Sequence, residues 1–275
     1  MTQLAFIFDL EGVLIDHMQR QCEITSKAFS SMGINIRITP ETYQLRSEGE
    51  LHITRDFLSG LYIMQRERIS PQQAKENPAI IVQERRKLGE NDWHMIDELV
   101  TRFDTLRTKG ELVVDGQKYV VVTKEPKLQG ISQMLYLANR EGHKIAMVTA
   151  GKKVDAESFM EKADLLHYFN PEFLFYGEDK VRKDDMFKQV SKIFEERYGI
   201  PKGLQFVVED SLGGISDANT NGLRSILVLS GNTSMERLRN LSPEETPSFV
   251  LKSAKDIIGV INNNVGNVGK KALKV

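Results

Sequence analysis

The sequence has almost no cysteine, with one in 275 residues. A single thiol cannot form an intramolecular disulfide or a zinc site built from several cysteines, and it is typical of a reducing compartment. Neither sign of charge is in excess, because 37 Lys and Arg residues stand against 38 Asp and Glu residues, a net charge of −1. Proteins that bind nucleic acids or acidic membrane surfaces usually carry a basic excess, so we expect neither kind of partner.

Long apolar runs are also missing. The N-terminal apolar run, residues 4–8, stops at Asp9, and no basic residue precedes it. It is too short for a membrane helix, which needs about 20 apolar residues, and it lacks the basic start of a secretion signal. We therefore expect a cytoplasmic protein. The C-terminal segment is rich in Asn and Gly and then basic, so we expect residues 266–275 to form a flexible tail.

Short apolar runs rich in β-branched residues alternate with segments of helical periodicity. Leu128, Ile131, Leu135 and Ala138, for example, lie at helical spacing before the second run. This alternation predicts an α/β fold with a doubly wound, Rossmann-like parallel sheet covered by helices on both faces. The runs expected to form strands are residues 4–9, 144–149, 173–176, 205–210, 225–229 and 248–252.

One long segment between the first and second runs breaks this alternation and looks mainly helical. Near its end, Asp115-Gly116 stands between two apolar runs, which predicts a β-hairpin at 111–123. An insertion after the first strand of such a sheet would lie over the carboxyl ends of the strands, where these folds bind ligands. The expected domains are a discontinuous catalytic core over 1–16 and 127–265 and an inserted cap over 17–126.

Polar residues end several of the predicted strands. Asp9 ends the first, Thr149 ends the second, and Glu209 and Asp210 end the fourth. The carboxyl ends of parallel strands meet at one edge of the sheet, so these side chains should converge. Carboxylates at close range repel one another unless a cation joins them, and a site of oxygen ligands suits Mg²⁺.

The same residues offer a complete set of groups for phosphoryl transfer. With a metal present, Asp9 could attack phosphorus as a nucleophile, and Glu11 could protonate the leaving oxygen and then activate water. Thr149 could donate a hydrogen bond to a phosphoryl oxygen. A lysine after the third strand, Lys180 or Lys183, would supply fixed positive charge.

At these residues the sequence resembles the haloacid dehalogenase superfamily, mainly its phosphatase and β-phosphoglucomutase-like branch with a helical cap. The matching motifs are FDLEGVLID, MVTAG and VVEDSLGGISDANTNG. The resemblance covers about residues 1–16 and 127–260. It implies that Asp9 forms an aspartyl-phosphate and that Thr149 binds phosphate. It also implies that Asp9, Asp210 and the backbone carbonyl of Glu11 bind Mg²⁺, with Glu209 beside them.

Two features depart from the family pattern. The family usually has Asp at the position of Glu11, although enolase-phosphatases of the superfamily have Glu there. The third motif usually reads Lys-Pro-x-Pro-Asp, and here Lys180 to Asp184 keeps the spacing without either proline. Lys183 is the competing choice for the motif lysine, and we favour Lys180.

The leading hypothesis is a Mg²⁺-dependent phosphomonoester hydrolase that acts on a small phosphorylated metabolite through an aspartyl-phosphate. The alternatives are a phosphosugar mutase of the same fold and a binding or regulatory protein with weakened catalysis. Specificity should lie in the cap, where the resemblance fades. Arg46, Arg55 and Lys27 are candidate groups there for a substrate anion.

Overall fold

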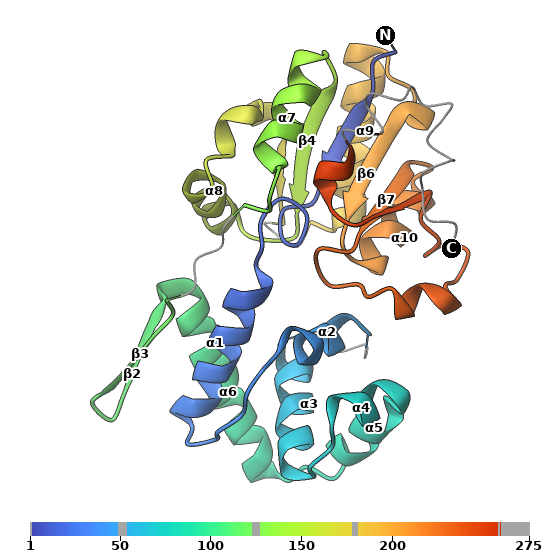
Figure 1. The fold of residues 1–275 in the computed structure, drawn as a ribbon. Coiled ribbons are helices and arrows are strands. Elements are labelled where there is room, and N and C mark those ends of the chain that lie inside the picture. Colours follow the sequence, from blue (N-terminus) through green and yellow to red (C-terminus); the bar gives the residue numbers. More distant parts are fainter. Residues whose placement is uncertain (1, 49–53, 123–126, 178–180, 258, 260–275) are drawn as a thin grey trace. The chain divides into compact units, whose positions relative to one another are not determined.

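The computed structural model describes residues 2–48, 54–122, 127–177, 181–257 and 259. Its contacts divide the chain into two compact units, which we treat separately (Figure 1). The core unit comprises Met1–His17 and Glu125–Val275, and the inserted unit comprises Met18–Lys124. Within the described residues, none of the helices has the length and hydrophobicity that a membrane crossing requires.

The core unit contains a six-stranded parallel sheet with the strand order β5-β4-β1-β6-β7-β8. This order confirms the predicted doubly wound sheet, because the chain starts in the middle and builds outward on both sides. Each strand overlaps one of the six apolar runs. The strands are β1 (Ala5–Phe8), β4 (Lys144–Thr149), β5 (Leu174–Tyr176), β6 (Gln205–Glu209), β7 (Arg224–Val228) and β8 (Phe249–Leu251).

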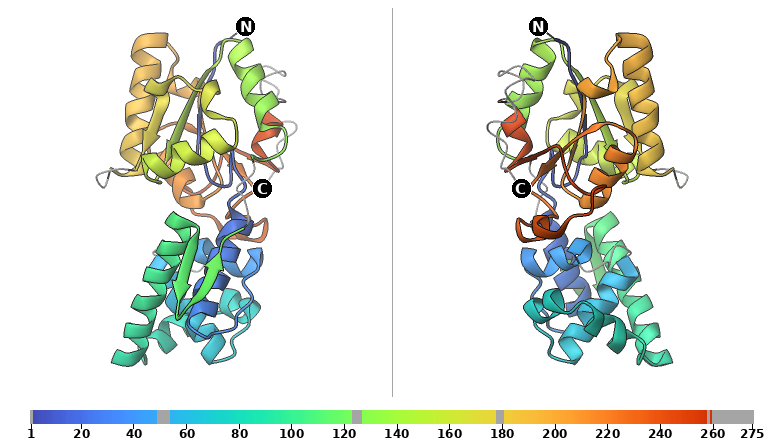
Figure 2. Two further views of the ribbon diagram at one scale, coloured as in Figure 1. Left: turned by 90° about the vertical axis from the view of Figure 1, so that its left-hand side faces the viewer. Right: turned by 90° about the vertical axis from the view of Figure 1, so that its right-hand side faces the viewer.

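Helices cover both faces of this sheet (Figure 2). Phe6 and Phe8 of β1 pack on one side in a cluster with α7 and α8, whereas Ala5 and Ile7 pack on the other side with α9 and α10. Both faces are buried, which explains why the strands are continuous apolar runs. The helices are α7 (Ile131–Arg140), α8 (Lys153–Lys162), α9 (Lys183–Tyr198) and α10 (Leu212–Thr220), with short 3-10 turns η1 (Leu166–Tyr168), η2 (Pro171–Phe173), η4 (Lys202–Leu204), η5 (Glu236–Asn240) and η6 (Ala254–Asp256).

The strand register brings the predicted site residues to one edge. Phe8, the last residue of β1, lies beside Met147 of β4 and Val208 of β6. Asp9 continues this ladder, since its backbone N–H donates to the Val208 carbonyl over 2.9 Å. Asp9 therefore lies next to Glu209, the last residue of β6.

The inserted unit is mainly helical and has its own hydrophobic core. It ends in an antiparallel hairpin whose turn, Asp115-Gly116, has positive φ angles of 49° and 78°. This geometry explains the Asp-Gly signal in the sequence. The elements are α1 (Met18–Ser31), α2 (Pro40–Glu48), α3 (Thr54–Arg66), α4 (Pro71–Glu76), α5 (Ala79–Arg85), α6 (Glu90–Lys109), β2 (Glu111–Val114) and β3 (Gln117–Val120).

Candidate active site

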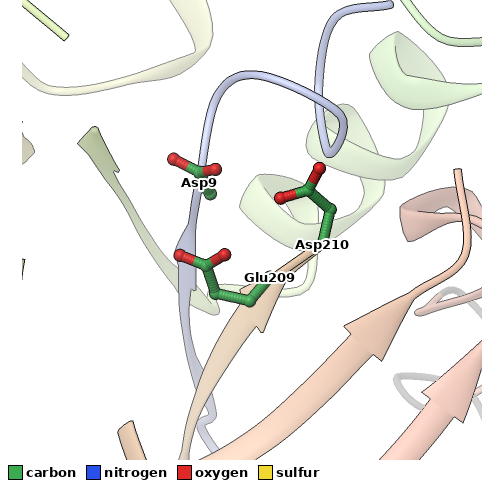
Figure 3. Close-up of side chains that lie close together, drawn as sticks. All are labelled: Asp9, Glu209 and Asp210. Carbon is green, nitrogen blue, oxygen red and sulfur yellow. The ribbon is translucent and has the colours of Figure 1, made fainter. Parts of the chain in front are cut away.

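Three acidic side chains converge where β1 and β6 end. Asp9, Glu209 and Asp210 each offer a carboxylate oxygen, and these oxygens all lie within 4.8 Å of one another (Figure 3). The residues are only 7%, 0% and 1% exposed. Such close carboxylates repel one another in the protein interior, so the site requires compensating positive charge.

Part of that charge comes from Lys183, the first residue of α9. Its Nζ lies 2.8 Å from Asp9 Oδ1 and also forms an ion pair with Glu209 Oε1. When every group is ionised, the three carboxylates and one ammonium leave a net charge of −2, which one divalent cation would neutralise. The oxygen donors and this residual charge fit Mg²⁺.

The buried charges shift one another's proton affinities. Burial raises the pKa of Asp9 to about 7, against the lowering effect of Lys183 and with a further rise from Glu209. Burial, followed by the charges of Asp9 and Glu209, also raises the pKa of Asp210 well above its usual range. Burial alone would lower the pKa of Lys183, but Asp9 and Glu209 raise it, so this ammonium stays charged.

The start of α10 shapes the surroundings of Glu209. Ser211 caps this helix, and its Oγ donates to Glu209 Oε2 over 3.0 Å. Gly214 lies in the first turn, where a Cβ would approach the Glu209 carboxylate to 2.2 Å. A helix start with a serine cap and a glycine therefore leaves room for a buried carboxylate directly beneath it.

Thr149 lies at the same edge of the sheet, as the last residue of β4. It is 3% exposed, and its Oγ1 accepts a hydrogen bond from the Gly151 N–H over 3.0 Å. Because this bond uses an acceptor lone pair, the hydroxyl hydrogen can still be donated to a ligand. Its assignment to phosphate binding stays a prediction.

The structure does not place the other two predicted residues, Glu11 and Lys180, in the carboxylate cluster of the described residues. Glu11 is half-buried in the turn after β1, and it does not belong to the carboxylate cluster found among the described residues. Its acid–base role and its carbonyl's metal ligation stay predictions. Lys180, the favoured motif lysine, lies outside the described residues, whereas the competing Lys183 contacts two of the three carboxylates.

The candidate anion-binding residues of the inserted unit mostly have partners of their own. Arg55 forms a two-point ion pair with Asp97, with distances of 2.7 and 3.1 Å. Lys27 pairs with Glu23 over 3.3 Å, and Arg46 donates to two hydroxyl groups of the same unit. Ion pairs within the inserted unit therefore explain the charges of Arg55 and Lys27 without a substrate anion.

Sequence reasoning missed the loop after β7. Its polar run, residues 230–233, reaches the site and contacts Asp210. The loop follows an apolar run that predicted a strand, but no local feature of the sequence pairs it with Asp210.

Comparison with known proteins assigns the chain to a family. It belongs to the haloacid dehalogenase-like hydrolases, whose family model matches residues 4–219. No curated protein sequence gives a significant match.

Solved structures with low sequence identity share the fold. A proposed phosphoglycolate phosphatase from Lactobacillus delbrueckii subsp. bulgaricus has a TM-score of 0.69 and 16% identity, with 95% of this chain and 99% of that chain covered. A haloacid dehalogenase-like protein from Streptococcus pneumoniae has a TM-score of 0.62 and 12% identity, with 94% and 98% covered. A proposed β-phosphoglucomutase from Thermotoga maritima has a TM-score of 0.57 and 16% identity, with 95% and 99% covered.

Proposed function

We propose that the protein is a Mg²⁺-dependent phosphomonoester hydrolase that acts on a small phosphorylated metabolite through a phosphorylated Asp9. One observation carries the proposal: Asp9 is buried, touches Lys183, and lies within 4.8 Å of two further carboxylates. Membership in a hydrolase family and a fold shared with proteins named as phosphatases support it.

Asp9 is the nucleophile of this reaction. One carboxylate oxygen attacks phosphorus while the bond from phosphorus to the substrate oxygen breaks, and the side chain of Glu11 gives that oxygen a proton. In the second half, Glu11 takes a proton from water, the water oxygen attacks phosphorus, and the bond to Asp9 breaks to release inorganic phosphate.

The remaining residues stabilise the charge. Asp9, Asp210 and the Glu11 carbonyl would hold Mg²⁺, with Glu209 beside them. The positive charge of the ion would offset the negative charge of the phosphoryl oxygens. The Thr149 hydroxyl donates to one of these oxygens.

Lys183 takes the role of the motif lysine. Its ammonium lowers the pKa of the Asp9 carboxyl and so favours its ionised form, it orients that carboxylate, and it opposes the negative charge that the phosphoryl group brings. This assignment replaces our preference for Lys180 because Lys183 already touches Asp9 and Glu209.

The single cysteine, buried Cys22, supports a reducing cytoplasmic location as part of the same proposal.

The test is phosphate release from an aryl phosphate and from a panel of phosphorylated metabolites, with and without EDTA. Asp9→Asn should lower the rate at least about 10³-fold, because an amide is a poor nucleophile. Asp164→Asn is the matched control, since its carboxylate is 80% exposed and pairs with His167. Full turnover in EDTA, or by folded Asp9→Asn protein, would contradict the proposal, and an isomerised sugar phosphate without released phosphate would identify a mutase.

A further inference from the structure

The loop after β7 lies beyond residues 4–219, the part of the chain that the family model matches. Ser230, Gly231, Asn232 and Thr233 form its polar run, which we call the 230–233 loop. The loop is about 20 residues from Asp210 and more than 200 residues from Gly12 in the sequence. It nevertheless forms hydrogen bonds to both residues.

Four hydrogen bonds connect this loop to the ends of β1 and β6. The Ser230 hydroxyl donates to the Gly12 carbonyl over 2.7 Å. The backbone N–H and the side-chain amide of Asn232 both donate to Asp210 Oδ2, over 2.8 and 2.7 Å. The Thr233 hydroxyl donates to the backbone carbonyl of Asp210 over 2.7 Å.

Two glycines enclose the same carboxylate oxygen. A Cβ on Gly231 would lie 2.0 Å from Asp210 Oδ2, and a Cβ on Gly12 would lie 2.2 Å from it. Any side chain at these positions would displace the carboxylate. Gly12 has a φ of 78°, which also favours glycine, but Gly231 has no positive φ, so only the close approach to Asp210 restricts it.

The two oxygens of Asp210 therefore have different surroundings. Oδ2 takes both bonds from Asn232, whereas Oδ1 receives none from the described residues. In Figure 3 one oxygen points toward the loop that follows β1, and the other points toward Asp9 and Glu209.

We propose that the 230–233 loop positions Asp210 so that Oδ1 alone is presented to Mg²⁺, with Asn232 as the positioning residue. Mg²⁺ requires near-octahedral geometry and binds few protein carboxylates, so a carboxylate fixed in the right orientation binds it with little rearrangement. The inference rests on the metal dependence in the proposed function. It assigns a role in metal binding to a loop that lies outside residues 4–219, the part of the chain that the family model matches.

The test measures Mg²⁺ binding directly, by calorimetric titration of the full-length, EDTA-stripped protein with MgCl₂. Asn232→Ala removes one of the two bonds to Oδ2 and should weaken binding about 10-fold, whereas Gly231→Ala forces the carboxylate away and should weaken it about 100-fold. At saturating Mg²⁺, phosphate release by Asn232→Ala should return toward the parent rate, because the loop acts through metal binding.

Two matched controls separate this role from general damage. Asn139→Ala also removes an amide hydrogen bond, to the Tyr168 carbonyl at 2.9 Å, and Gly213→Ala adds a methyl group in open space. Both should bind Mg²⁺ within about twofold of the parent. The unfolding temperature in EDTA is measured for every variant, since a purely structural loop would lower it without changing Mg²⁺ affinity.

Parent-like Mg²⁺ affinity in both Asn232→Ala and Gly231→Ala would overturn the proposal. If Gly231→Ala does not fold, Ser230→Ala replaces it and should weaken Mg²⁺ binding by about threefold, the effect of losing one indirect bond. A parent protein that binds no Mg²⁺ overturns the inference, even if it releases phosphate. A parent that binds Mg²⁺ but releases no phosphate leaves the inference intact and refutes the proposed activity.

Discussion

Lys183→Met is the substitution that most directly tests the charge balance of the site. The ammonium lies 2.8 Å from Asp9 Oδ1, and the Lys183, Asp9 and Glu209 side chains are 16%, 10% and 0% exposed. With an effective dielectric constant of about 20, one such pair is worth about 6 kcal/mol of Coulomb energy. The desolvation of the charges offsets part of this, and breaking a buried ion pair typically costs about 3–5 kcal/mol.

We therefore expect Lys183→Met to lower the free energy of unfolding by about 3–5 kcal/mol in EDTA, where no metal replaces the lost charge. Urea denaturation measures this change. The same substitution at Lys180 is the matched control and should change the stability by less than about 0.5 kcal/mol. Phosphate release should fall at least about 100-fold in Lys183→Met and stay near the parent rate in Lys180→Met.

The opposite pattern would refute this reasoning. If Lys180→Met loses activity while Lys183→Met keeps both activity and stability, then the ion pairs of Lys183 are incidental and Lys180 is the motif lysine. Lys183→Arg adds a check, because it keeps the charge but changes its geometry. It should recover part of the stability and little of the activity.

Three further predictions concern the core unit. Glu11→Gln should slow alkyl phosphates at least about 10-fold more than an aryl phosphate, because the aryl leaving group needs no acid; equal losses would assign Glu11 a structural role. Burial lowers the pKa of His143 below 6.5, and its Nδ1 accepts from the Leu4 N–H over 3.2 Å, so its neutral form is favoured on folding. Stability should therefore fall as the pH drops below about 6.5, by at most about 1.4 kcal/mol per pH unit, and urea titrations of His143→Gln should show a smaller fall. Asn221→Ala removes the amide bond to Asp184 Oδ1 at the start of α9 and should cost about 1.5–3 kcal/mol of unfolding free energy; an unchanged urea midpoint would contradict this.

The fold could be predicted because its signals are local. A parallel strand that is buried on both faces is a continuous apolar run, so 205–210 already indicated β6, and Asp115-Gly116 already indicated the hairpin turn. The bounds of the strands differ from the predicted runs by one residue or so at several ends. Asp9, which follows β1, keeps one backbone bond to β6, while its side chain belongs to the site.

The carboxylates of the site were predictable for a related reason. Asp9, Glu209 and Asp210 lie at the carboxyl ends of two strands of the predicted parallel sheet, where strand ends converge, and the structure brings all three together. The contact of Lys183 with Asp9 and Glu209 was not predictable from spacing, because it depends on where α9 begins. α9 begins at Lys183, three residues after the position that the motif spacing favoured.

The 230–233 loop was missed because its partners are distant in the sequence. The bond from Ser230 joins residues 218 positions apart, and no local pattern encodes such a pair. Gly12 and Gly231 show the same limit: each appears as an ordinary turn glycine in the sequence, and only the folded chain shows that Asp210 Oδ2 fills the space where their side chains would be.

The energetics of the cluster also bear on whether the fold still supports a working site. Three buried carboxylates around one ammonium stabilise a metal-free protein poorly, since apolar residues of similar size often do so better than buried ions. The cluster nevertheless has complete supports: Lys183 for Asp9, Ser211 for Glu209 and Asn232 for Asp210. A chain that used this fold only as a binding module would gain stability by losing these charges. The presence of these charged groups, and of the residues that hold them, therefore favours a functioning hydrolase over a binding protein with weakened catalysis.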